Sequence, residues 1–490
     1  MDRLNQANLP AVPATVQTPT YDRSNLKTGI VHFGVGGFHR AHMAMSIDRL
    51  LNQGKAKDWA ICGVGLLEHD RRMRDVFAEQ DCLFTLVLKH PDGQRHVSVI
   101  GSITEYIFAP ENPTGLLEKL ASPDTKIVSL TITEGGYNFD RVTGEFDAKT
   151  AAIAAELAPN SEPSTVFGFV TEGLRLRRER GLAPFTVQSC DNIQANGDVA
   201  KRMFTAFANL KDPDLGSWIE EFVRFPNSMV DRITPVTAPE DVVEVAETLG
   251  LEDHWPVVAE PFFQWVVEDE FPLGRPPLEE VDVQMVQDVM PYELMKLRLL
   301  NASHQGLTYF GYLSGYRYAH EATSDPAIAQ FLMKYMVEEA TPTLLPVPGV
   351  DLDAYRHKLI ERFSNPEVKD TLARLCAESS DRIPKWLVPV IHERLAQGGD
   401  VALSAAIVAS WARYAEAVDE QGEPINVVDP LKDVLVPIAQ SQRVHPLAFI
   451  ENRELFGDLV DNPKFTEPYL AALSSLHTNG AHATVVAISK

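Results

Sequence analysis

The chain has 490 residues, of which 45% are hydrophobic and 23% charged; this composition is typical of globular proteins and excludes disordered, collagenous and fibrous classes. Its 44 basic and 68 acidic residues give a formal net charge of −24. Because such a surface repels phosphate backbones and anionic membranes, we expect neither a nucleic-acid partner nor a membrane partner. The length predicts two or three domains.

The start of the chain and its cysteines bear on the compartment in which the protein works. The first residues carry no basic segment followed by an apolar one, so we expect no signal peptide. The uncharged stretch 401–412 is shorter than the roughly 20 residues of a membrane-spanning helix. The cysteines lack a CxxC or zinc-binding spacing, which favours reduced thiols: Cys62, Cys82, Cys190 and Cys376. These features predict a cytoplasmic enzyme.

Strand-like and helix-like segments alternate in the first half of the chain. A short apolar run at 29–33 ends in the glycine turn Gly34-Val-Gly-Gly37, and a helical pattern follows over about 40–51. Further apolar runs predict strands at 59–64, 126–132 and 185–189. Apolar strands that alternate with helices indicate a mostly parallel sheet covered on both faces. Ligands bind at the carboxyl ends of such strands, where this chain places the glycine turn, Thr133-Glu-Gly-Gly136 and Cys190-Asp-Asn192.

The pattern changes after the proline-rich stretch 272–277. From about residue 288 onward, a period near 3.6 predicts helices over 292–312, 326–340, 353–363, 383–397 and 402–417. We therefore predict an α/β, Rossmann-like dinucleotide-binding domain over residues 1–287. A mostly α-helical substrate and catalytic domain is expected over residues 288–490.

Gly34-Val-Gly36 lies at a strand-to-helix turn, where glycines let the backbone approach a pyrophosphate. The standard fingerprint has a third small residue where this chain has His39, so a tight structural turn fits the motif as well. The acid that binds the adenosine ribose normally follows about twenty residues on, whereas Glu68 and Asp70, the nearest candidates, lie farther along. A carboxylate there would favour NAD over NADP, although a solvated loop acid fits the same sequence.

The most informative segment runs from Pro291 to His304. On an α-helix with about 100° per residue, Glu293 falls near 60° and His304 near 80° from Lys296. Asn301 falls near 140° on the same scale. Polar side chains on a half-buried face are costly unless they are paired or functional. A lysine among leucines suits a general base, and a neighbouring amide and imidazole suit a reacting hydroxyl or alkoxide. A polar cluster that closes a domain interface fits the spacing equally well.

Tyr292 and Lys296 also match the Tyr-x-x-x-Lys pair of short-chain dehydrogenases. In that family the pair lies much closer to the glycine turn, in a chain about half as long. Here about 260 residues separate the pair from Gly34, and the second half is helical. We therefore reject this assignment.

Six segments occur in order along nearly the whole chain: Gly34-Val-Gly-Gly-Phe-His-Arg-Ala-His42, Ile61-Cys-Gly-Val-Gly65, Ser129-Leu-Thr-Ile-Thr-Glu-Gly-Gly-Tyr137, Ser189-Cys-Asp-Asn192, Phe225-Pro-Asn-Ser-Met-Val-Asp-Arg-Ile-Thr-Pro235 and Lys296-x4-Asn301-x2-His304. Together they resemble the polyol-specific long-chain dehydrogenases, also called the mannitol dehydrogenase family. The resemblance implies a zinc-independent, NAD-dependent enzyme that interconverts D-mannitol and D-fructose by hydride transfer at C2. It also implies a monomer.

The resemblance implies a role for each site residue. Lys296 matches the catalytic acid and base, while Asn192 and Asn301 match the amides of an oxyanion hole. His304 matches a substrate-positioning histidine, and Glu293 matches a glutamate that passes the proton to solvent. Contacts to the far hydroxyls of the polyol are implied for Asp231 and Arg374, with Arg382 and Lys385 as weaker candidates. Contacts to NAD are implied for Gly34, Val35, Gly36, Gly37, Phe38, Asp70, Thr133 and Glu134. His69 stands where a second acid is sometimes found, which softens the expected preference for NAD.

Three alternatives stay open. Within the family, fructuronate or tagaturonate reductase needs a basic clamp, which Arg374, Arg382 and Lys385 would supply. An arabinitol dehydrogenase is the second, and the third is a protein that binds NAD without catalysis. Retention of Lys296 and His304 together with the two asparagines argues against the last. We expect no metal, since no cysteine or histidine spacing fits a zinc site.

Overall fold

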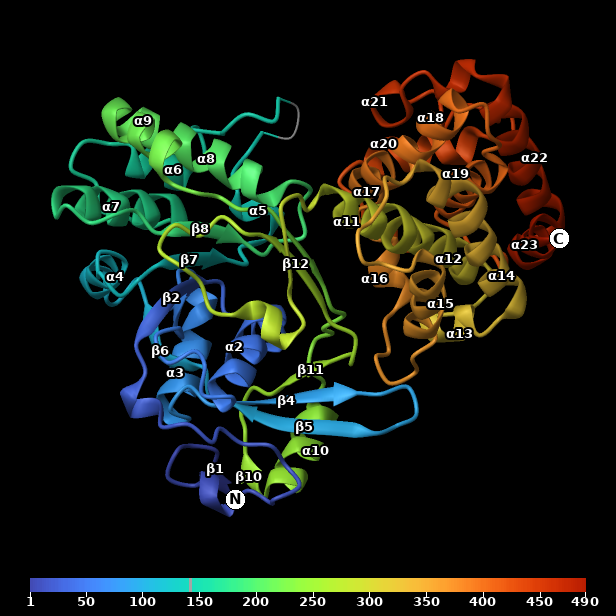
Figure 1. Ribbon diagram of the computed structural model, residues 1–490. Helices are drawn as coiled ribbons and strands as arrows, with labels where there is room; N and C mark the ends of the chain where they lie inside the picture. Colours follow the sequence, from blue (N-terminus) through green and yellow to red (C-terminus); the bar gives the residue numbers. More distant parts are fainter. Residues whose placement is uncertain (141–142) are drawn as a thin grey trace. The chain divides into compact units, whose positions relative to one another are not determined.

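The computed structural model describes residues 1–140 and 143–490, which form two compact units, Met1–Val289 and Met290–Lys490. A five-stranded parallel sheet lies at the centre of the first unit, in the order β6-β3-β2-β7-β8 (Figure 1). Its strands are β2 (Thr28–Phe33), β3 (Ala60–Gly65), β6 (Ile103–Phe108), β7 (Ile127–Leu130) and β8 (Thr186–Ser189). The chain begins in the middle strand, builds one edge, and then crosses β2 to build the other. This is the strand order of a Rossmann fold, with its switch point between β2 and β7.

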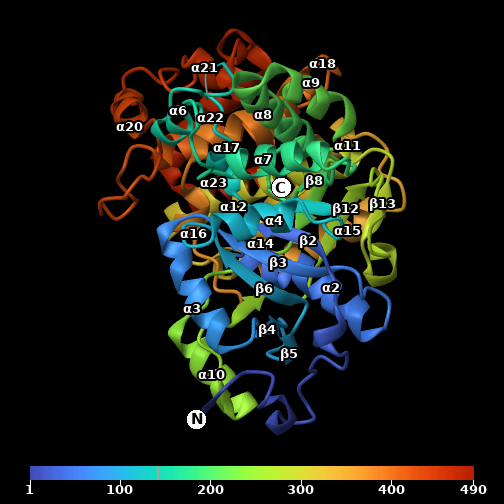
Figure 2. The same ribbon diagram turned by 90° about the vertical axis from the view of Figure 1, so that its left-hand side faces the viewer.

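Both faces of this sheet are covered by helices, which explains the continuous apolar runs of its strands. In β2, Ile30 belongs to one hydrophobic core and Val31 to the other. The first core includes residues of α2 (Met43–Asn52) and α3 (Arg71–Glu79), which lie near β3 and β6 in Figure 2. The second core includes residues of α4 (Pro113–Leu120), α7 (Val166–Glu179), α8 (Asn196–Lys211) and α9 (Pro213–Phe222).

Three smaller sheets, which were not predicted from the sequence, complete the described part of the first unit. A hairpin of β4 (Phe84–Lys89) and β5 (Arg95–Ile100) pairs with β11 (Val257–Ala259). A second sheet holds β9 (Ser228–Asp231), β12 (Gln264–Glu268) and β13 (Gln284–Val286). A third pairs β1 (Asp2–Arg3) with β10 (Leu251–Glu252), next to α10 (Pro239–Leu249). These strands are short or mix polar with apolar residues, so their apolar patterns are weak.

The second unit is helical. Its elements are α11 (Met290–Met295), a π segment (Lys296–Asn301), α12 (Ala302–Leu313), α13 (Ala319–Thr323), α14 (Pro326–Tyr335), a second π segment (Met336–Ala340), α15 (Leu352–Phe363), α16 (Leu372–Cys376), α17 (Ser379–Trp386), α18 (Val388–Ala396), α19 (Ala402–Tyr414), α20 (Lys432–Ser441), α21 (Arg453–Phe456), α22 (Pro463–Asn479) and α23 (Ala481–Ser489). Helix α19 is buried from its second residue to its last and packs against α12 and α22. The predicted fold class, a Rossmann-like α/β domain followed by a mostly helical one, is confirmed.

Several predicted helices differ in detail from those observed. The helix expected over 40–51 is two helices, α1 (Gly37–Ala41) and α2, because the backbone breaks at His42 with φ −122° and ψ −93°. The helix expected over 383–397 is α17 followed by α18, which has a proline in its first turn. The helices expected over 292–312 and 326–340 each contain a π segment.

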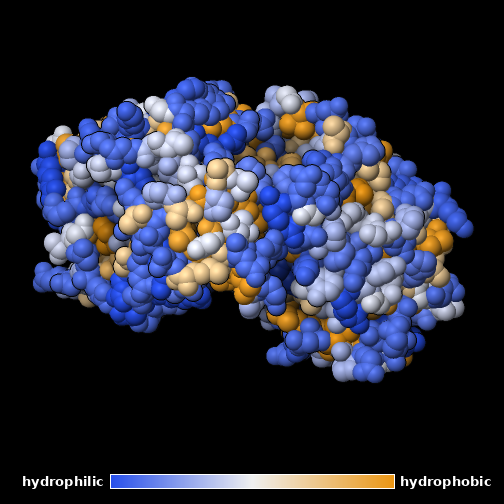
Figure 3. Space-filling view, turned by 90° about the horizontal axis from the view of Figure 1, so that it is seen from below, coloured by the Kyte–Doolittle hydropathy of each residue, from blue (hydrophilic) through white to orange (hydrophobic). Residues whose placement is uncertain are grey.

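The face drawn in Figure 3 is mostly hydrophilic, with apolar residues in small groups. Across the described residues, no helix is both long and apolar enough to cross a membrane. Within the same ranges, no three His, Cys, Asp or Glu side chains are grouped so that they could hold a metal ion. The free cysteines are all buried: Cys62, Cys82, Cys190 and Cys376.

Candidate active site

The glycine turn follows β2 and leads into α1. Gly34 has φ +90°, and a Cβ there would lie 2.1 Å from the carbonyl oxygen of Thr131, so only glycine fits. The hydroxyl of Thr131 donates to the Gly34 carbonyl at 2.6 Å, which ties the turn to the end of β7. At Gly36 a Cβ would meet no atom closer than 4.0 Å, so this side of the turn is open. The turn therefore fits the phosphates of a dinucleotide at the switch point of the sheet.

Two stacked histidines lie beneath this turn. The His32 ring on β2 is 2.7 Å from the Ser129 hydroxyl and 2.9 Å from the Thr131 hydroxyl. It stacks on His39 with 3.4 Å between ring centres. Burial lowers the pKa of His32 to about 3 and holds the pKa of His39 well below its usual value, so both rings are neutral. His39, at the third position of the fingerprint, thus packs as a ring where other Rossmann turns use a small residue.

Asp70 lies at the carboxyl end of β3, although four residues separate it from Gly65. One of its carboxylate oxygens accepts the N–H of Leu66 at 2.9 Å and that of Leu67 at 2.8 Å. The loop folds back through these bonds and returns the acid to the strand end, beside β2. This explains the unusual spacing in the sequence. The neighbouring His69 is mostly exposed, 3.6 Å from the second carboxylate oxygen.

Asp191 joins the turns that follow β7 and β8. It accepts the N–H of Thr133 at 2.8 Å, the N–H of Ile132 at 3.1 Å and the hydroxyl of Tyr137 at 2.8 Å. Burial is the main cause that raises the pKa of Asp191 to about 6, against the lowering effect of these donors. Thr133, with φ +62°, is held in this way beside the turn that carries Asn192.

Asp191 and Tyr137 lie within two of the motifs, but no role was predicted for either residue. The available signal was an acid placed directly after a buried strand, at the edge where ligands bind. Thr133 and Glu134, both predicted to contact the cofactor, are exposed on α5 (Thr133–Gly136) at this same edge.

Asp231 lies outside the parallel sheet, as the last residue of β9, and is buried. Its neighbour Arg232 donates to the carbonyls of Glu260 at 3.0 Å and Pro261 at 3.2 Å, and also to that of Ala41. Burial lowers the pKa of Arg232 to about 10. The arginine thereby ties the end of β9 to the end of α1 and fixes the backbone that presents Asp231.

In the second unit, the predicted catalytic lysine lies at the start of the π segment. The N–H of Ala302 donates to the carbonyl of Leu297, five residues back. The angle of about 140° predicted between Lys296 and Asn301 assumed an α-helix and is therefore wrong. In the π register a residue and the fifth one after it are a single turn apart, so Lys296 and Asn301 share a face.

Three polar side chains of this helix are buried. Glu293, Lys296 and Asn301 are 8%, 7% and 5% exposed. Within residues 1–140 and 143–490, the amide nitrogen of Asn301 has no hydrogen-bond partner. A buried donor without an acceptor lowers the stability of the fold, unless a ligand oxygen accepts its hydrogen bond.

His304 and Tyr292 flank these residues. The His304 ring, on α12, packs at 4.2 Å between ring centres against Phe363 of α15. The hydroxyl of Tyr292 donates to the carbonyl of Pro348 at 2.8 Å. This bond engages the hydroxyl that a short-chain dehydrogenase would use, in keeping with the rejected assignment.

The basic residues expected to bind substrate have different surroundings. Arg374 on α16 donates to both oxygens of Asp370, at 2.7 and 2.5 Å, so its charge is balanced. Arg382 on α17 donates to the carbonyl of Leu375 at 3.0 Å, at the end of α16. Lys385 is exposed on the same helix. Helices α16 and α17 pack against α12, and α17 also packs against the π segment.

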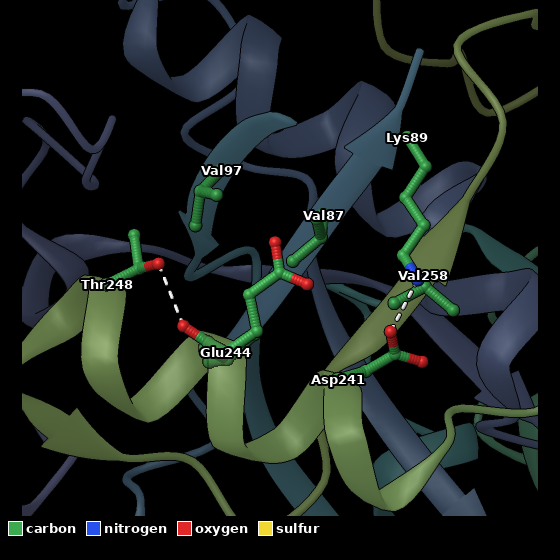
Figure 4. Close-up of a pocket in the computed structure, with 8 residues that line it drawn as sticks. Val87, Lys89, Val97, Asp241, Glu244, Thr248 and Val258 are labelled. Atoms are coloured by element: carbon green, nitrogen blue, oxygen red, sulfur yellow. Dashed lines mark hydrogen bonds and ion pairs between the residues drawn. The ribbon is translucent and has the colours of Figure 1, made fainter. Parts of the chain in front are cut away.

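A separate hollow in the first unit lies between α10 and strands β4, β5 and β11 (Figure 4), with an empty volume of about 210 Å³ that includes open solvent. Val87, Val97 and Val258 line it, and the ion pair of Lys89 with Asp241 closes one side. None of the predicted site residues lies here, so this hollow has no part in the candidate active site.

The chain matches known proteins over almost its full length. The model of the Mannitol dehydrogenase Rossmann domain matches residues 28–280, and that of the Mannitol dehydrogenase C-terminal domain matches residues 288–477. The chain belongs to the mannitol dehydrogenase family. It is therefore an NAD-dependent polyol dehydrogenase, which confirms the enzyme class and the cofactor expected from the sequence.

Individual members of the mannitol dehydrogenase family support this assignment. A mannitol 2-dehydrogenase of Aspergillus fumigatus is 44% identical over 99% of this chain and 98% of its own length. The Pseudomonas fluorescens mannitol 2-dehydrogenase, solved as a ternary complex with NAD and D-mannitol, is 44% identical with a TM-score of 0.88 over 99% of both chains. A substrate-free D-sorbitol dehydrogenase is 38% identical with a TM-score of 0.90, over 99% of this chain and 100% of its own.

Proposed function

We propose that the protein catalyses the NAD-dependent, metal-independent interconversion of D-mannitol and D-fructose at C2. The observation that carries this proposal is the helix 290–313, whose π segment holds the buried Lys296 and the amide nitrogen of Asn301, which has no hydrogen-bond partner among the described residues. The relatives supply the substrate class, since two of them are named mannitol 2-dehydrogenases and one was solved with D-mannitol.

NAD fits the first unit at the carboxyl edge of the parallel sheet. The open side of the glycine turn, residues 34–38, suits the pyrophosphate. Asp70 suits the adenosine ribose, since both of its backbone N–H bonds fall on one carboxylate oxygen and the other lies 3.6 Å from the exposed His69. The turn that carries Thr133 and Glu134 lies at the same edge and forms the third part of the proposed NAD site. When bound, NAD supplies the nicotinamide carbon that accepts or returns the hydride.

The chain's own residues act on the proton and on the reacting oxygen. In the oxidation, the neutral amine of Lys296 accepts the proton of the C2 hydroxyl, and the amides of Asn192 and Asn301 donate to the oxygen as negative charge develops there. The C2–H bond then breaks as a hydride leaves, and the carbonyl forms. Glu293 accepts the proton from Lys296 and passes it to solvent. In the reduction, Lys296 returns the proton to the oxygen.

The remaining residues orient the polyol. His304 fixes the substrate beside Lys296, and its own ring is fixed by Phe363. Asp231 and Arg374 bind the far hydroxyls, with Arg382 and Lys385 in lesser roles. The pairing of Arg374 with Asp370 favours a neutral polyol over a uronate, because a substrate carboxylate would face an arginine whose charge is already balanced.

D-Sorbitol is the second candidate substrate, favoured by the match to D-sorbitol dehydrogenase. It differs from D-mannitol only in the configuration at C2 and is oxidised there to the same ketose. An arabinitol dehydrogenase remains a further alternative within the family. We also propose that the protein is a cytoplasmic monomer.

The test is a NADH-oxidation assay on the purified protein in EDTA with D-fructose, D-fructuronate, D-tagaturonate and D-xylulose. NAD reduction is then measured with D-mannitol, D-sorbitol and D-arabinitol. We expect the highest kcat/KM for D-fructose and D-mannitol. Preference for a uronate would overturn the substrate and assign Arg374 to a carboxylate. Loss of activity in EDTA would overturn metal independence, and NADH binding without turnover would indicate a non-catalytic protein.

A further inference from the structure

The π segment is fastened to the rest of the second unit through its central arginine. The guanidinium of Arg298 donates to both carboxylate oxygens of Glu393, each at 2.6 Å, and to the carbonyl of Thr343 at 2.6 Å. The Arg298 side chain is 7% exposed. The Glu393 side chain is 44% exposed, so the pair lies at the edge of the buried region. A bidentate pair fixes direction as well as distance, so residues 296–301 are held against α18 and the turn after the second π segment.

Two side-chain hydroxyls donate hydrogen bonds to backbone carbonyls of the π segment. Where a π turn rejoins an α-helix, the spacing of the backbone bonds changes and carbonyls at the junction need other donors. The Tyr335 hydroxyl donates to the Arg298 carbonyl at 3.2 Å. The Ser303 hydroxyl donates to the Leu300 carbonyl at 3.0 Å and to that of Leu299. Tyr335 is fully buried and directly precedes the second π segment, which packs against the first.

The register of this segment decides where its polar groups point. In an α-helix, Asn301 would lie about 140° around the axis from Lys296, and one amide could not reach an oxygen held at the lysine. In the π register the two are a turn apart. Single π turns are uncommon and occur frequently at functional sites, so contacts that favour this register bear directly on catalysis.

We propose that Tyr335 and the Arg298–Glu393 pair are positioning residues that hold residues 296–301 in the π register, so that Lys296 and Asn301 act on the same substrate oxygen. This inference rests on the proposed function. It goes further by assigning a part in catalysis to Tyr335 and Glu393, which lie outside the set of residues that touch substrate.

The first test removes one hydroxyl. Tyr335→Phe keeps the ring and removes the hydroxyl that donates to the Arg298 carbonyl; we expect kcat to fall about tenfold, because small misplacements of catalytic groups are costly. The Kd for NADH is expected to stay within twofold. Tyr309→Phe is the matched control: Tyr309 is also fully buried, but its hydroxyl contacts the side chains of Gln305 and Ser379. Its kcat should stay within twofold of wild type.

A double-mutant cycle separates positioning from general loss of stability. If Tyr335 acts by aiming the Asn301 amide, Tyr335→Phe should lower kcat by less than about twofold once Asn301→Ala is present. An equal loss of kcat in both backgrounds would overturn the proposal. The cycle uses whichever ketose the protein reduces fastest, so a wrong substrate assignment would leave this result intact.

The second test addresses the ion pair and adds a readout that needs no turnover. Glu393→Gln removes one of the two parallel bonds and should lower kcat at least as much as Tyr335→Phe; Glu361→Gln, which breaks the exposed pair with Lys358, is its control. Amide hydrogen exchange in the peptide 296–303 should rise in both test variants and in neither control. Unchanged exchange in the test variants would overturn the proposal whatever the activity.

Discussion

The two units hold their site residues in different ways. In the first, the residues that we propose to bind NAD lie on turns at strand ends, and carboxylates such as Asp70 and Asp191 fix these turns by accepting backbone N–H groups. In the second, Lys296 and Asn301 lie inside a helix whose own hydrogen bonding is altered. A site on turns depends on what ties each turn to the sheet, whereas a site within a helix depends on the register of one backbone. The predictions below test this difference.

The largest expected effect concerns the lysine. Lys296→Ala should lower kcat by several orders of magnitude, because the general acid and base acts in the chemical step. NADH binds to the first unit and its Kd should stay nearly unchanged, as measured by the fluorescence of the bound cofactor. Lys358→Ala, a surface lysine paired with Glu361, is the control and should leave both constants unchanged. Retention of most of the kcat by Lys296→Ala would contradict the mechanism.

Next in size is the comparison of the two asparagines, one from each unit. Asn192→Ala and Asn301→Ala should each lower kcat by roughly 10²-fold, as expected for one lost donor to an oxyanion. Steady-state kinetics with the best ketose measures this directly. A large loss for only one of them would show that a single unit stabilises the charge on the oxygen, and the shared oxyanion hole would then be wrong.

The sequence predicted the edge of the sheet better than it predicted the lysine helix, for a physical reason. Parallel strands end at one edge, so apolar runs followed by glycine, Thr133 or Asn192 locate a site from topology alone. The sequence departs from the standard glycine fingerprint at His39, which takes the place of a small residue. Only the structure explains this histidine, because its stacking partner His32 lies in the preceding strand, seven residues earlier.

The π segment could not be read from the sequence in the same way. Leucines around Lys296 and Asn301 have a period that fits an α-helix, and the bonds that favour the π register come from Tyr335 and Glu393, more than thirty residues away along the chain. Long-range contacts of this kind leave no local pattern. The small sheets of the first unit were missed because their strands have only two or three residues or mix polar with apolar ones, as in β5 (Arg95–Ile100), so their apolar patterns are weak.

A smaller effect is expected at the ribose acid. Asp70→Ala should narrow the ratio of kcat/KM for NAD over NADP by about tenfold, because the carboxylate repels a 2′-phosphate and accepts the ribose hydroxyls. Part of the loss with NAD will come from the loop, since Asp70 also holds the N–H groups of Leu66 and Leu67. Asp75→Ala, an exposed acid on α3 paired with Arg74, is the control. An unchanged ratio would move the ribose contact elsewhere.

The smallest expected effect compares one buried carboxylate from each unit. Asp191 accepts two successive backbone N–H groups and the Tyr137 hydroxyl; Glu339, in the second π segment, accepts the N–H groups of Leu403 and Ser404 and the Ser404 hydroxyl. Burial is the main cause that raises the pKa of Asp191 to about 6 and that of Glu339 to about 7. Each carboxylate thus accepts two backbone N–H groups and one hydroxyl, although Asp191 follows a strand and Glu339 lies in a π segment.

Because each pKa is higher in the folded protein than in the unfolded chain, each group contributes stability that is fully present below about pH 4 and is lost as the pH rises through about 6 or 7. Between pH 5 and 8 we expect each to reduce the free energy of unfolding by about 1–2 kcal/mol. Asp191→Asn should flatten this pH dependence for amide exchange in residues 186–200, and Glu339→Gln should flatten it for residues 402–414. Urea unfolding of the same variants checks the total. If amide exchange near the substituted residue keeps its pH dependence in Asp191→Asn or Glu339→Gln, another group titrates there. If one variant flattens the pH dependence in both regions, the separate assignment of the two carboxylates is contradicted.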